Sequence, residues 1–327
     1  MDTTAGEANE LRTWSLFGLR LASDHPFLTQ LHPTDGEPEL TLRSVSAAPL
    51  PPGWERLPSS YASPAMIDDE QHFLTIVTTE RCTVFRFTEV VDFFVFGDEI
   101  LCHLHDSAYA YMVELHFLGF VMAYWFERRG APAIHAAAVV VDDAAIGFLS
   151  TNKGGKSSLA ASFMQGGHPL LTDDILAIER AGEHFVARPS YPQMRMWPEQ
   201  AQHFVGDAAS LAQVHPRLSK RRVPVGPHGL GAFCDAKRRL RRLYVPERQD
   251  GGEITFTTLP FGEAVFALAR YSFLTDIVEH VGLHRSRFAV LADLVRTVGV
   301  RRVAYPSGME RLPEVVRAIQ DDARAAG

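Results

Sequence analysis

Hydrophobic and polar positions divide the chain into a β-rich first part and an alternating second part. Between residues 13 and 96 the hydrophobic runs are short, and stretches bearing Pro and Gly separate them. Runs of this length bounded by turn residues predict β-strands, here at residues 14–19, 40–42 and 83–87. Consecutive prolines near residues 49–52 predict a surface loop, because proline lacks the amide donor that a strand or helix needs. We therefore expect a small β-rich domain.

A longer hydrophobic stretch follows at residues 109–129, with apolar residues at helical spacings and two arginines before Gly130. Basic residues in the last turn and a glycine after it are typical of a helix C-terminus. Glu114 and His116 interrupt the stretch, whereas a membrane span needs about 20 predominantly apolar residues. We predict a buried helix here.

Beyond this helix the pattern alternates between strands and helices, which is typical of an α/β domain. We place the boundary near the end of the helix. The first domain is then a β-rich N-terminal domain of residues 1–128 that ends in a linking helix, and the second is residues 129–327. Strands are predicted at 134–141, 144–149, 169–171 and 302–305, and helices at 156–165, 263–271, 273–281, 286–298 and the C-terminus.

Composition narrows the function classes. A length of 327 residues suits two domains, and 46% hydrophobic with 22% charged residues is ordinary for a folded protein. A net charge of -7 argues against nucleic acid as a partner. The three cysteines form no CxxC pair, and the first residues lack the basic and apolar regions of a secretory signal. We expect a cytoplasmic protein with no membrane partner.

A phosphate-binding loop is predicted at residues 150–157. Gly155-Lys156-Ser157 satisfies the end of the phosphate-loop pattern, and Ser150 stands where the pattern has its first glycine. The apolar strand before the loop and the helix after it would let backbone amides and the helix dipole meet phosphate oxygens. A chance turn before a helix is the alternative. The residues expected at the nucleotide are Ser150, Thr151, Asn152, Lys153, Gly154, Gly155, Lys156, Ser157 and Ser158, with Lys156 on the β- and γ-phosphates and Ser157 on magnesium.

A histidine is expected beside this loop. Residues 134–150 have the pattern of a β-hairpin with Asp142 and Asp143 at its turn. If the turn has two residues, His135 lies opposite Ser150, and cross-strand neighbours are about 4.5 to 5.5 Å apart. A histidine that only finishes a strand edge is the other interpretation.

Two carboxylates follow the next predicted strand. Asp173 and Asp174 come directly after an apolar run, at the end of a strand where ligands of α/β sheets bind. Successive side chains of extended chain point in opposite directions, so one aspartate is expected to face an acceptor as general base and the other to face a metal. A pair that only caps a turn remains the alternative.

Two further clusters are not assigned to chemistry. Residues 102–106, Cys-His-Leu-His-Asp, resemble a metal site, but strand alternation puts His103 and His105 on one face and the other three residues on the opposite face. We do not expect metal binding there. His168 stands at a helix-to-strand turn, where we expect it to satisfy loop hydrogen bonds.

The order of histidine, phosphate loop, helix, Gly167-His168 and paired aspartates resembles the HPr serine kinase/phosphorylase family, over about residues 134–179. The resemblance implies an α/β fold with a P-loop HPr-kinase-like C-terminal catalytic domain and a smaller β-rich N-terminal domain. It also implies that the chain uses ATP and Mg²⁺. Asp173 would be the general base, Lys156 would be catalytic, and His135 would either assist Asp173 or contact phosphate. Ser157 and Asp174 would form the magnesium side, although the assignment between the two aspartates stays open.

The remainder departs from the bifunctional enzymes of that family. The acidic signature segment after the core is not recognisable, and residues 191–198, Tyr-Pro-Gln-Met-Arg-Met-Trp-Pro, occupy that region. This segment is more similar to HPr-kinase-related proteins of peptide natural-product clusters, including kinases of lasso-peptide precursors. The resemblance implies that Arg195 contacts phosphate and that the N-terminal domain holds the acceptor. A purely structural ion pair of Arg195 is an equal alternative.

The sequence thus predicts a phosphotransferase that uses ATP or another nucleoside triphosphate and Mg²⁺, with a serine of a peptide or small protein as acceptor. A kinase of a free small molecule such as serine, and a nucleotide-binding regulator without catalysis, are the alternatives. The resemblance makes a homo-oligomer an option, because HPr kinases form hexamers. The acceptor, any phosphorylase activity, the nucleotide preference and the oligomeric state are left open by the sequence.

Overall fold

The computed structural model describes residues 10–151 and 154–325, and its fold is mixed α/β with three sheets within those residues. The chain divides into two compact units, Met1–Val121 and Met122–Gly327. The boundary expected at residues 128 and 129 lies just past the end of the helical stretch in which this division falls. We call the two parts unit 1 and unit 2.

Unit 1 contains a nine-stranded sheet with the order β3-β1-β2-β4-β9-β8-β7-β6-β5. Its strands pair antiparallel except that β4 is parallel to both β2 and β9. The predicted run at residues 14–19 is two strands, because Phe17 and Gly18 have positive φ angles and form a turn. The strands are β1 (Arg12–Leu16), β2 (Leu19–Ser23), β3 (His32–Pro33), β4 (Leu40–Ser44), β5 (Tyr61–Ala62), β6 (Leu74–Thr78), β7 (Thr83–Phe87), β8 (Val91–Phe96) and β9 (Glu99–Leu104).

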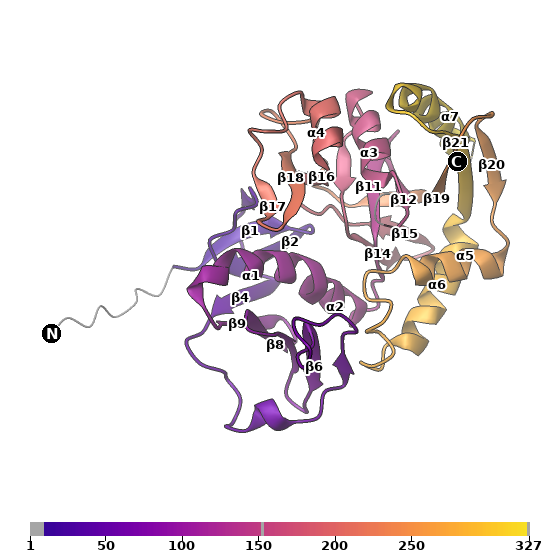
Figure 1. Cartoon of the computed structure of the whole chain (residues 1–327). Coiled ribbons are helices and arrows are strands. Elements are labelled where there is room, and N and C mark those ends of the chain that lie inside the picture. Colours follow the sequence, from indigo (N-terminus) through magenta and orange to yellow (C-terminus); the bar gives the residue numbers. More distant parts are fainter. Residues whose placement is uncertain (1–9, 152–153, 326–327) are drawn as a thin grey trace. The chain divides into compact units, whose positions relative to one another are not determined.

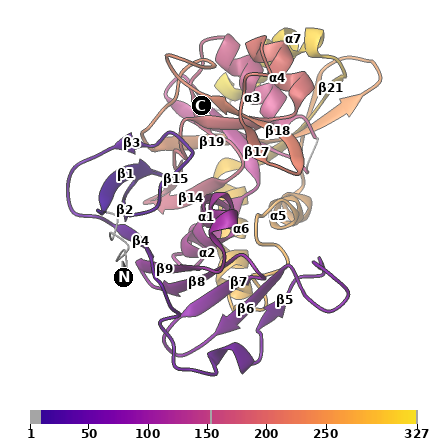
Figure 2. The same ribbon diagram turned by 60° about the vertical axis from the view of Figure 1, so that its left-hand side comes forward.

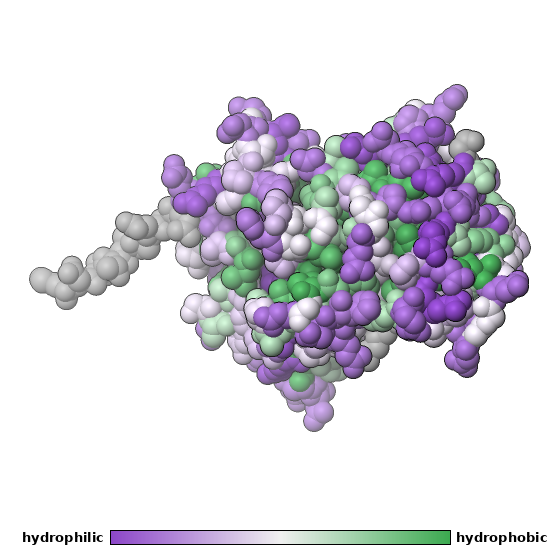
Figure 3. All heavy atoms as spheres, turned by 90° about the horizontal axis from the view of Figure 1, so that it is seen from above, coloured by the Kyte–Doolittle hydropathy of each residue, from purple (hydrophilic) through white to green (hydrophobic). Residues whose placement is uncertain are grey.

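The predicted helix at residues 109–129 is confirmed, with a π-helical turn at Phe117–Val121 between α1 (Ala110–His116) and α2 (Met122–Glu127). Gly130 ends it with a φ angle of 71°. The interrupting Glu114 is buried, and its carboxylate accepts bonds from the backbone amides of Leu28 and Thr29. None of the helices formed by the described residues combines the length and apolar character needed to cross a membrane. Hydrophilic residues cover most of the face in Figure 3, with hydrophobic ones in patches among them.

Unit 2 is built on a sheet with the order β10-β14-β15-β19-β12-β11-β13, to which β21 and β20 are added beside β19 (Figures 1 and 2). A small second sheet has the order β16-β18-β17. The strands are β10 (Ala133–Ile134), β11 (Ala136–Val141), β12 (Ala144–Leu149), β13 (Leu170–Thr172), β14 (Leu176–Ala181), β15 (His184–Ala187), β16 (Gln193–Met196), β17 (Gln213–His215), β18 (Leu218–Pro224), β19 (Arg238–Gln249), β20 (Thr255–Thr258) and β21 (Val300–Pro306).

Helices cover both faces of the large sheet of unit 2 (Figure 1). Alternation along β12 sends Ile146 and Phe148 into a core with α3, α4 and α7, while Ala145 and Leu149 enter the opposite core with α5 and α6. Both faces of the strand are thus buried, which explains its uninterrupted apolar sequence. The helices are α3 (Lys156–Gln165), α4 (Pro198–Val205), α5 (Phe261–Arg270), α6 (His284–Val298) and α7 (Leu312–Arg324).

The predicted hairpin of β11 and β12 is confirmed. Val141 pairs with Ala144 across a two-residue turn. Asp142 and Asp143 have φ angles of 46° and 59°, as the hairpin turn that matches strand twist requires. The last pair of the hairpin is Ala136 with Leu149. His135 precedes Ala136 in the chain, and Ser150 follows Leu149.

Three other parts of unit 2 test the sequence predictions. The helix predicted at 156–165 is α3 with the same bounds. The helix predicted at 273–281 is wrong, because the segment forms separate turns, including backbone bonds from Val278 to Leu274 and from Val281 to Ile277. The long strand β19 was not predicted, since five arginines and Pro246 interrupt its hydrophobic pattern.

Candidate functional site

The candidate site lies where several segments of unit 2 meet beyond the end of β12. Ser150 and Thr151 follow β12, Gly154 and Gly155 precede α3, the two aspartates follow β13, and Arg195 comes from β16. Since β12, β19 and β21 are parallel, their carboxyl ends share this edge of the sheet. In open α/β sheets this edge is where ligands bind.

Two glycines shape the loop before α3. Gly155 has a φ angle of 94°, in the region that favours glycine, and stands directly before the helix. A Cβ at Gly154 would lie 2.6 Å from both Cβ and Oγ of Ser150. The Ser150 side chain therefore occupies the space that only a glycine at 154 leaves open, and its hydroxyl donates to the carbonyl of Thr151 at 3.2 Å. Asn152 and Lys153, which were expected at the nucleotide, lie outside the described residues.

Lys156 and His135 are in direct contact. Lys156 is the first residue of α3, is only 6% exposed, and its Nζ lies 2.8 Å from Nε2 of His135. Because an ammonium can only donate, Nε2 accepts and the proton of the neutral imidazole sits on Nδ1. That nitrogen faces the backbone oxygen of Asp174 at 3.1 Å and its Oδ1 at 3.4 Å. Burial lowers the pKa of both His135 and Lys156, so the histidine is held neutral.

Asp173 is buried with both carboxylate oxygens engaged. Oδ1 accepts from the hydroxyl of Ser157 at 3.2 Å, and Oδ2 accepts from the backbone amide of Arg195 at 2.9 Å. Burial and the neighbouring charge of Asp174 raise the pKa of Asp173. A raised pKa makes this carboxylate a better proton acceptor than an ordinary aspartate.

Asp174 has a different environment although it is the next residue. Its Oδ2 pairs with Nη1 of Arg195 at 3.0 Å, and its φ angle of 82° is rare for a residue other than glycine. Burial acts to raise the pKa, but the neighbouring cations, Arg195 first, outweigh it and hold the pKa of Asp174 at about 2. The two carboxylates thus differ in partners and in proton affinity, which is the basis for giving them different tasks.

Arg195 connects these groups to the segment that follows β15. Besides its contacts with both aspartates, its Nη2 lies 3.3 Å from the hydroxyl of Tyr191. The side chain is therefore held in an ion pair beside the loop, which fits a positioning role as well as a phosphate contact. Ser158, also expected at the nucleotide, has its hydroxyl 2.6 Å from the amide nitrogen of Gln200 on α4.

Sequence reasoning missed part of the lining. A small pocket above the loop is bounded by Gly154 to Ser157 and Arg195, and also by Trp197, Gln200 and Lys220. Lys220 on β18 has its Nζ 5.4 Å from the centre of the Trp197 ring, and its charge acts on Lys156 and both aspartates. The only sequence signal for it is the basic run at residues 220–222, which gives no indication that one lysine turns toward the loop.

The donor set determines which ligands fit. The hydroxyl of Ser157 and the carboxylates of Asp173 and Asp174 are hard oxygen donors, which suit Mg²⁺. The side chains of Lys156, Lys220 and Arg195, with the N-terminus of α3, are suited to phosphate oxygens. His168 lies outside this set, since its ring contacts Gln320 and Phe163, in agreement with the structural role expected for it.

Comparisons with known proteins add little to this geometry. No protein-family model matches the chain, and no curated protein matches it. Among solved structures, the HPr(Ser) kinase/phosphatase from Coxiella burnetii is similar at 11% sequence identity and a TM-score of 0.33, over 59% of this chain and 96% of that chain. A similarity at this level carries no argument about function.

Proposed function

We propose that the chain is a kinase that uses ATP and Mg²⁺ to transfer the γ-phosphate to a hydroxyl group. The supporting observation is one connected network in which a buried lysine at the start of α3 contacts His135, while Ser157 contacts Asp173. A lysine, a hydroxyl and two carboxylates next to a helix N-terminus are the groups that phosphoryl transfer requires.

In this proposal the phosphates bind to the loop amides and to Lys156, whose ammonium then turns from His135 to the β- and γ-phosphates. Asp173 takes the proton of the acceptor hydroxyl as that oxygen bonds to the γ-phosphorus, and the bond from phosphorus to the bridging oxygen breaks to leave ADP. The raised pKa of Asp173 supports the role of base. The low pKa of Asp174 keeps it ionised, which a metal ligand needs.

His135 and Arg195 would position these two carboxylates. Nδ1 of His135 and the guanidinium of Arg195 approach different oxygens of Asp174, which fixes the orientation of its carboxylate. Mg²⁺, held by Ser157 and Asp174, would neutralise charge on the phosphate oxygens.

For the acceptor we propose a serine of a peptide or small protein. This choice rests on the resemblance of residues 191–198 to kinases of peptide natural-product clusters. The pocket above the loop is lined mostly by polar and basic side chains, with Trp197 as its aromatic member. A free amino acid such as serine is the second acceptor class, and the same experiment tests it.

The decisive experiment incubates the purified chain with ATP and Mg²⁺ and a serine-containing peptide library, and in parallel with free L-serine, and detects phosphate transfer by mass spectrometry. Lys156→Ala and Asp173→Asn remove the phosphate contact and the base. Lys237→Ala is the matched control, because this lysine has only a surface ion pair with Glu179.

Transfer by wild type and by Lys237→Ala, with loss in the two site variants, supports the proposal. Binding of ATP by calorimetry without transfer to either acceptor class would instead favour a nucleotide-binding regulator. Absence of both binding and transfer would contradict the proposal altogether.

A further inference from the structure

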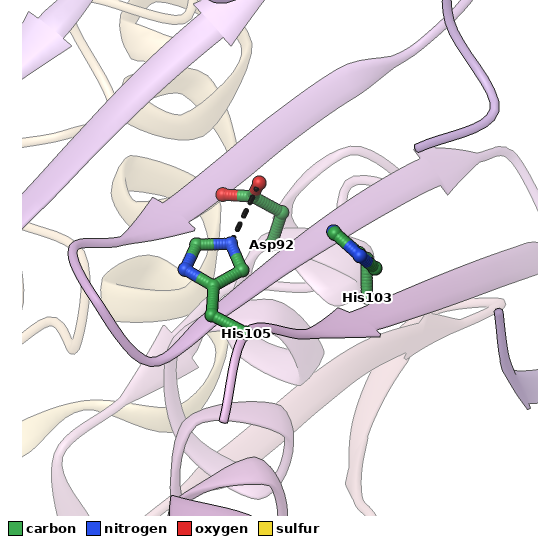
Figure 4. A group of neighbouring side chains, drawn as sticks. All are labelled: Asp92, His103 and His105. Atoms are coloured by element: carbon green, nitrogen blue, oxygen red, sulfur yellow. Dashed lines mark hydrogen bonds and ion pairs between the residues drawn. The ribbon is translucent and has the colours of Figure 1, made fainter. Parts of the chain in front are cut away.

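A second candidate site lies in unit 1. Asp92 on β8 pairs directly with His103 on β9, and His105 is two residues further along, so all three side chains are on one face of the β8–β9 hairpin. Figure 4 shows them together, with the bond between Asp92 and His105. Their candidate ligand atoms all lie within 4.8 Å of one another.

From this geometry we propose that Asp92, His103 and His105 bind a transition-metal ion of the Zn²⁺ class. Two imidazoles and one carboxylate are a donor set that zinc accepts, with a water in the fourth position. Ligand atoms around tetrahedral zinc are about 3.4 Å apart, given bonds of about 2.1 Å. The side chains therefore need only small rotations to enclose the ion.

The two oxygens of the Asp92 carboxylate have different partners, and this arrangement supports a metal site. Its Oδ1 is paired with Nε of Arg86 at 3.2 Å, and Oδ2 lies 3.0 Å from Nε2 of His105. Arg86 in turn lies over the Trp54 ring, with its guanidinium carbon 4.4 Å from the ring centre. Arg86 thus fixes Oδ1, while Oδ2 is directed toward His105. Metal sites often have a ligand carboxylate that a further partner orients in this way.

The three proposed ligand side chains differ in how exposed they are to solvent. The Asp92 side chain is 4% exposed, whereas that of His105 is 28% exposed and His103 is half-buried. The buried aspartate is a rigid anchor, and the two imidazoles, with ring centres 5.5 Å apart, can rotate to meet an ion from solution. Metal entry requires no opening of the sheet.

The neighbouring cysteine does not belong to the set. Cys102 is buried on the opposite face of β9, because successive side chains of a strand alternate between its faces. The pattern Cys-His-Leu-His-Asp therefore misidentifies the ligands. The third ligand comes from the adjacent strand.

The test uses the full chain without a histidine tag, freed of metal by EDTA and then titrated with Zn²⁺ by calorimetry. Co²⁺ serves as a spectroscopic probe, because its absorption reports the number and type of ligands. His103→Ala and His105→Ala remove one ligand each at positions that solvent reaches. His32→Ala, an exposed histidine of the same unit, is the matched control, and His135→Ala accounts for zinc at the candidate kinase site.

We expect one Zn²⁺ per chain in wild type, His32→Ala and His135→Ala, and a Kd that rises by roughly 100-fold in His103→Ala and in His105→Ala. Circular dichroism checks that these variants fold. Zinc affinity unchanged in both ligand variants, or lost only in His135→Ala, would overturn the proposal. So would the absence of measurable zinc binding to the folded wild type.

Discussion

The polar clusters of the two units are built in different ways. In unit 2 the groups come from the ends of strands and from loops, and mutual contacts hold the buried Asp173 and the half-buried Asp174 beside a lysine and an arginine. In unit 1 the groups lie along two strands of one hairpin, and only Asp92 is buried. Convergent loops can gather opposite charges out of water, whereas a strand face leaves its ligands open to an ion from solution.

The largest expected effect is on the rate of phosphate transfer, and it concerns the polar cluster of unit 2 alone. Asp173→Asn should lower the rate of phosphate transfer by about 10²- to 10⁴-fold, because the base is lost while its shape is kept. Asp174→Asn should instead raise the Mg²⁺ concentration needed for half-maximal rate. Steady-state kinetics over a magnesium series measures both.

His105→Ala is the control from the other unit, and it should leave transfer unchanged while weakening zinc binding. If His105→Ala lowers phosphate transfer as much as Asp173→Asn does, the two clusters do not act independently. Exchange of the two aspartate phenotypes would keep the kinase but reverse the roles of base and metal ligand.

A buried ion pair in unit 2 should give the next largest effect. Arg287 and Glu127 have side chains 7% and 2% exposed, with Nε 3.5 Å from Oε1. Arg287→Met leaves the carboxylate buried without its cation, which should cost about 3 to 5 kcal/mol of unfolding free energy. Arg285→Met, an exposed neighbour on α6, should change stability little.

The pH dependence of stability tests whether the charge of Glu127 causes the loss in Arg287→Met. Burial raises the pKa of Glu127, so protonation in acid favours the folded state and stability is lost as pH rises through that pKa. The deficit of Arg287→Met in urea unfolding should therefore be smaller at pH 5 than at pH 8. A deficit that does not change with pH would mean that lost packing is the cause.

Local patterns predicted the core of unit 2 well. Period-two and period-3.6 spacing, with glycines as stops, located β11, β12 and α3, and the two-residue turn gave the register that pairs Ala136 with Leu149. These features depend on neighbours in sequence. The sequence therefore predicted the strands and the helix that carry the candidate residues, and it left open how the two aspartates divide their partners.

What could not be predicted depends on contacts between distant residues. β19 is a central strand because β12, β15 and β21 pair with it, which no local hydrophobic pattern reveals. Lys220 reaches the loop only because β18 pairs with β16, the strand of Arg195. Asp92 was missed as a partner of His103 for the same reason, since strand register brings them together.

The loop offers a test of intermediate size. Because a Cβ at Gly154 would lie 2.6 Å from the Ser150 side chain, Gly154→Ala should force the loop to shift and weaken ATP binding roughly tenfold. Ser150→Gly removes the obstructing atoms, so the double variant Ser150→Gly/Gly154→Ala should recover most of the affinity. Calorimetry with ATP and Mg²⁺ measures all three variants.

A double variant as weak as Gly154→Ala alone would show that the backbone, and not the Ser150 side chain, limits residue 154. Gly251→Ala is the control, since a Cβ there meets no heavy atom within 4 Å. Its ATP affinity should equal that of wild type.

The smallest effect concerns Glu179, a carboxylate whose side chain is 27% exposed, close to the 21% of Asp174. Burial acts to raise the pKa of Glu179, but hydrogen bonds from Lys237 and Arg188 outweigh it and hold the pKa below its usual range. Glu179→Gln should cost about 1 kcal/mol at pH 7. A lowered pKa gives stability that is present above the unfolded-state pKa, about 4.3, and is lost as pH falls through the folded-state value. Urea unfolding should show the deficit narrowing from pH 7 to pH 4, with exposed Glu183→Gln showing none; a deficit that stays constant would assign the effect to hydrogen-bond shape and not to charge.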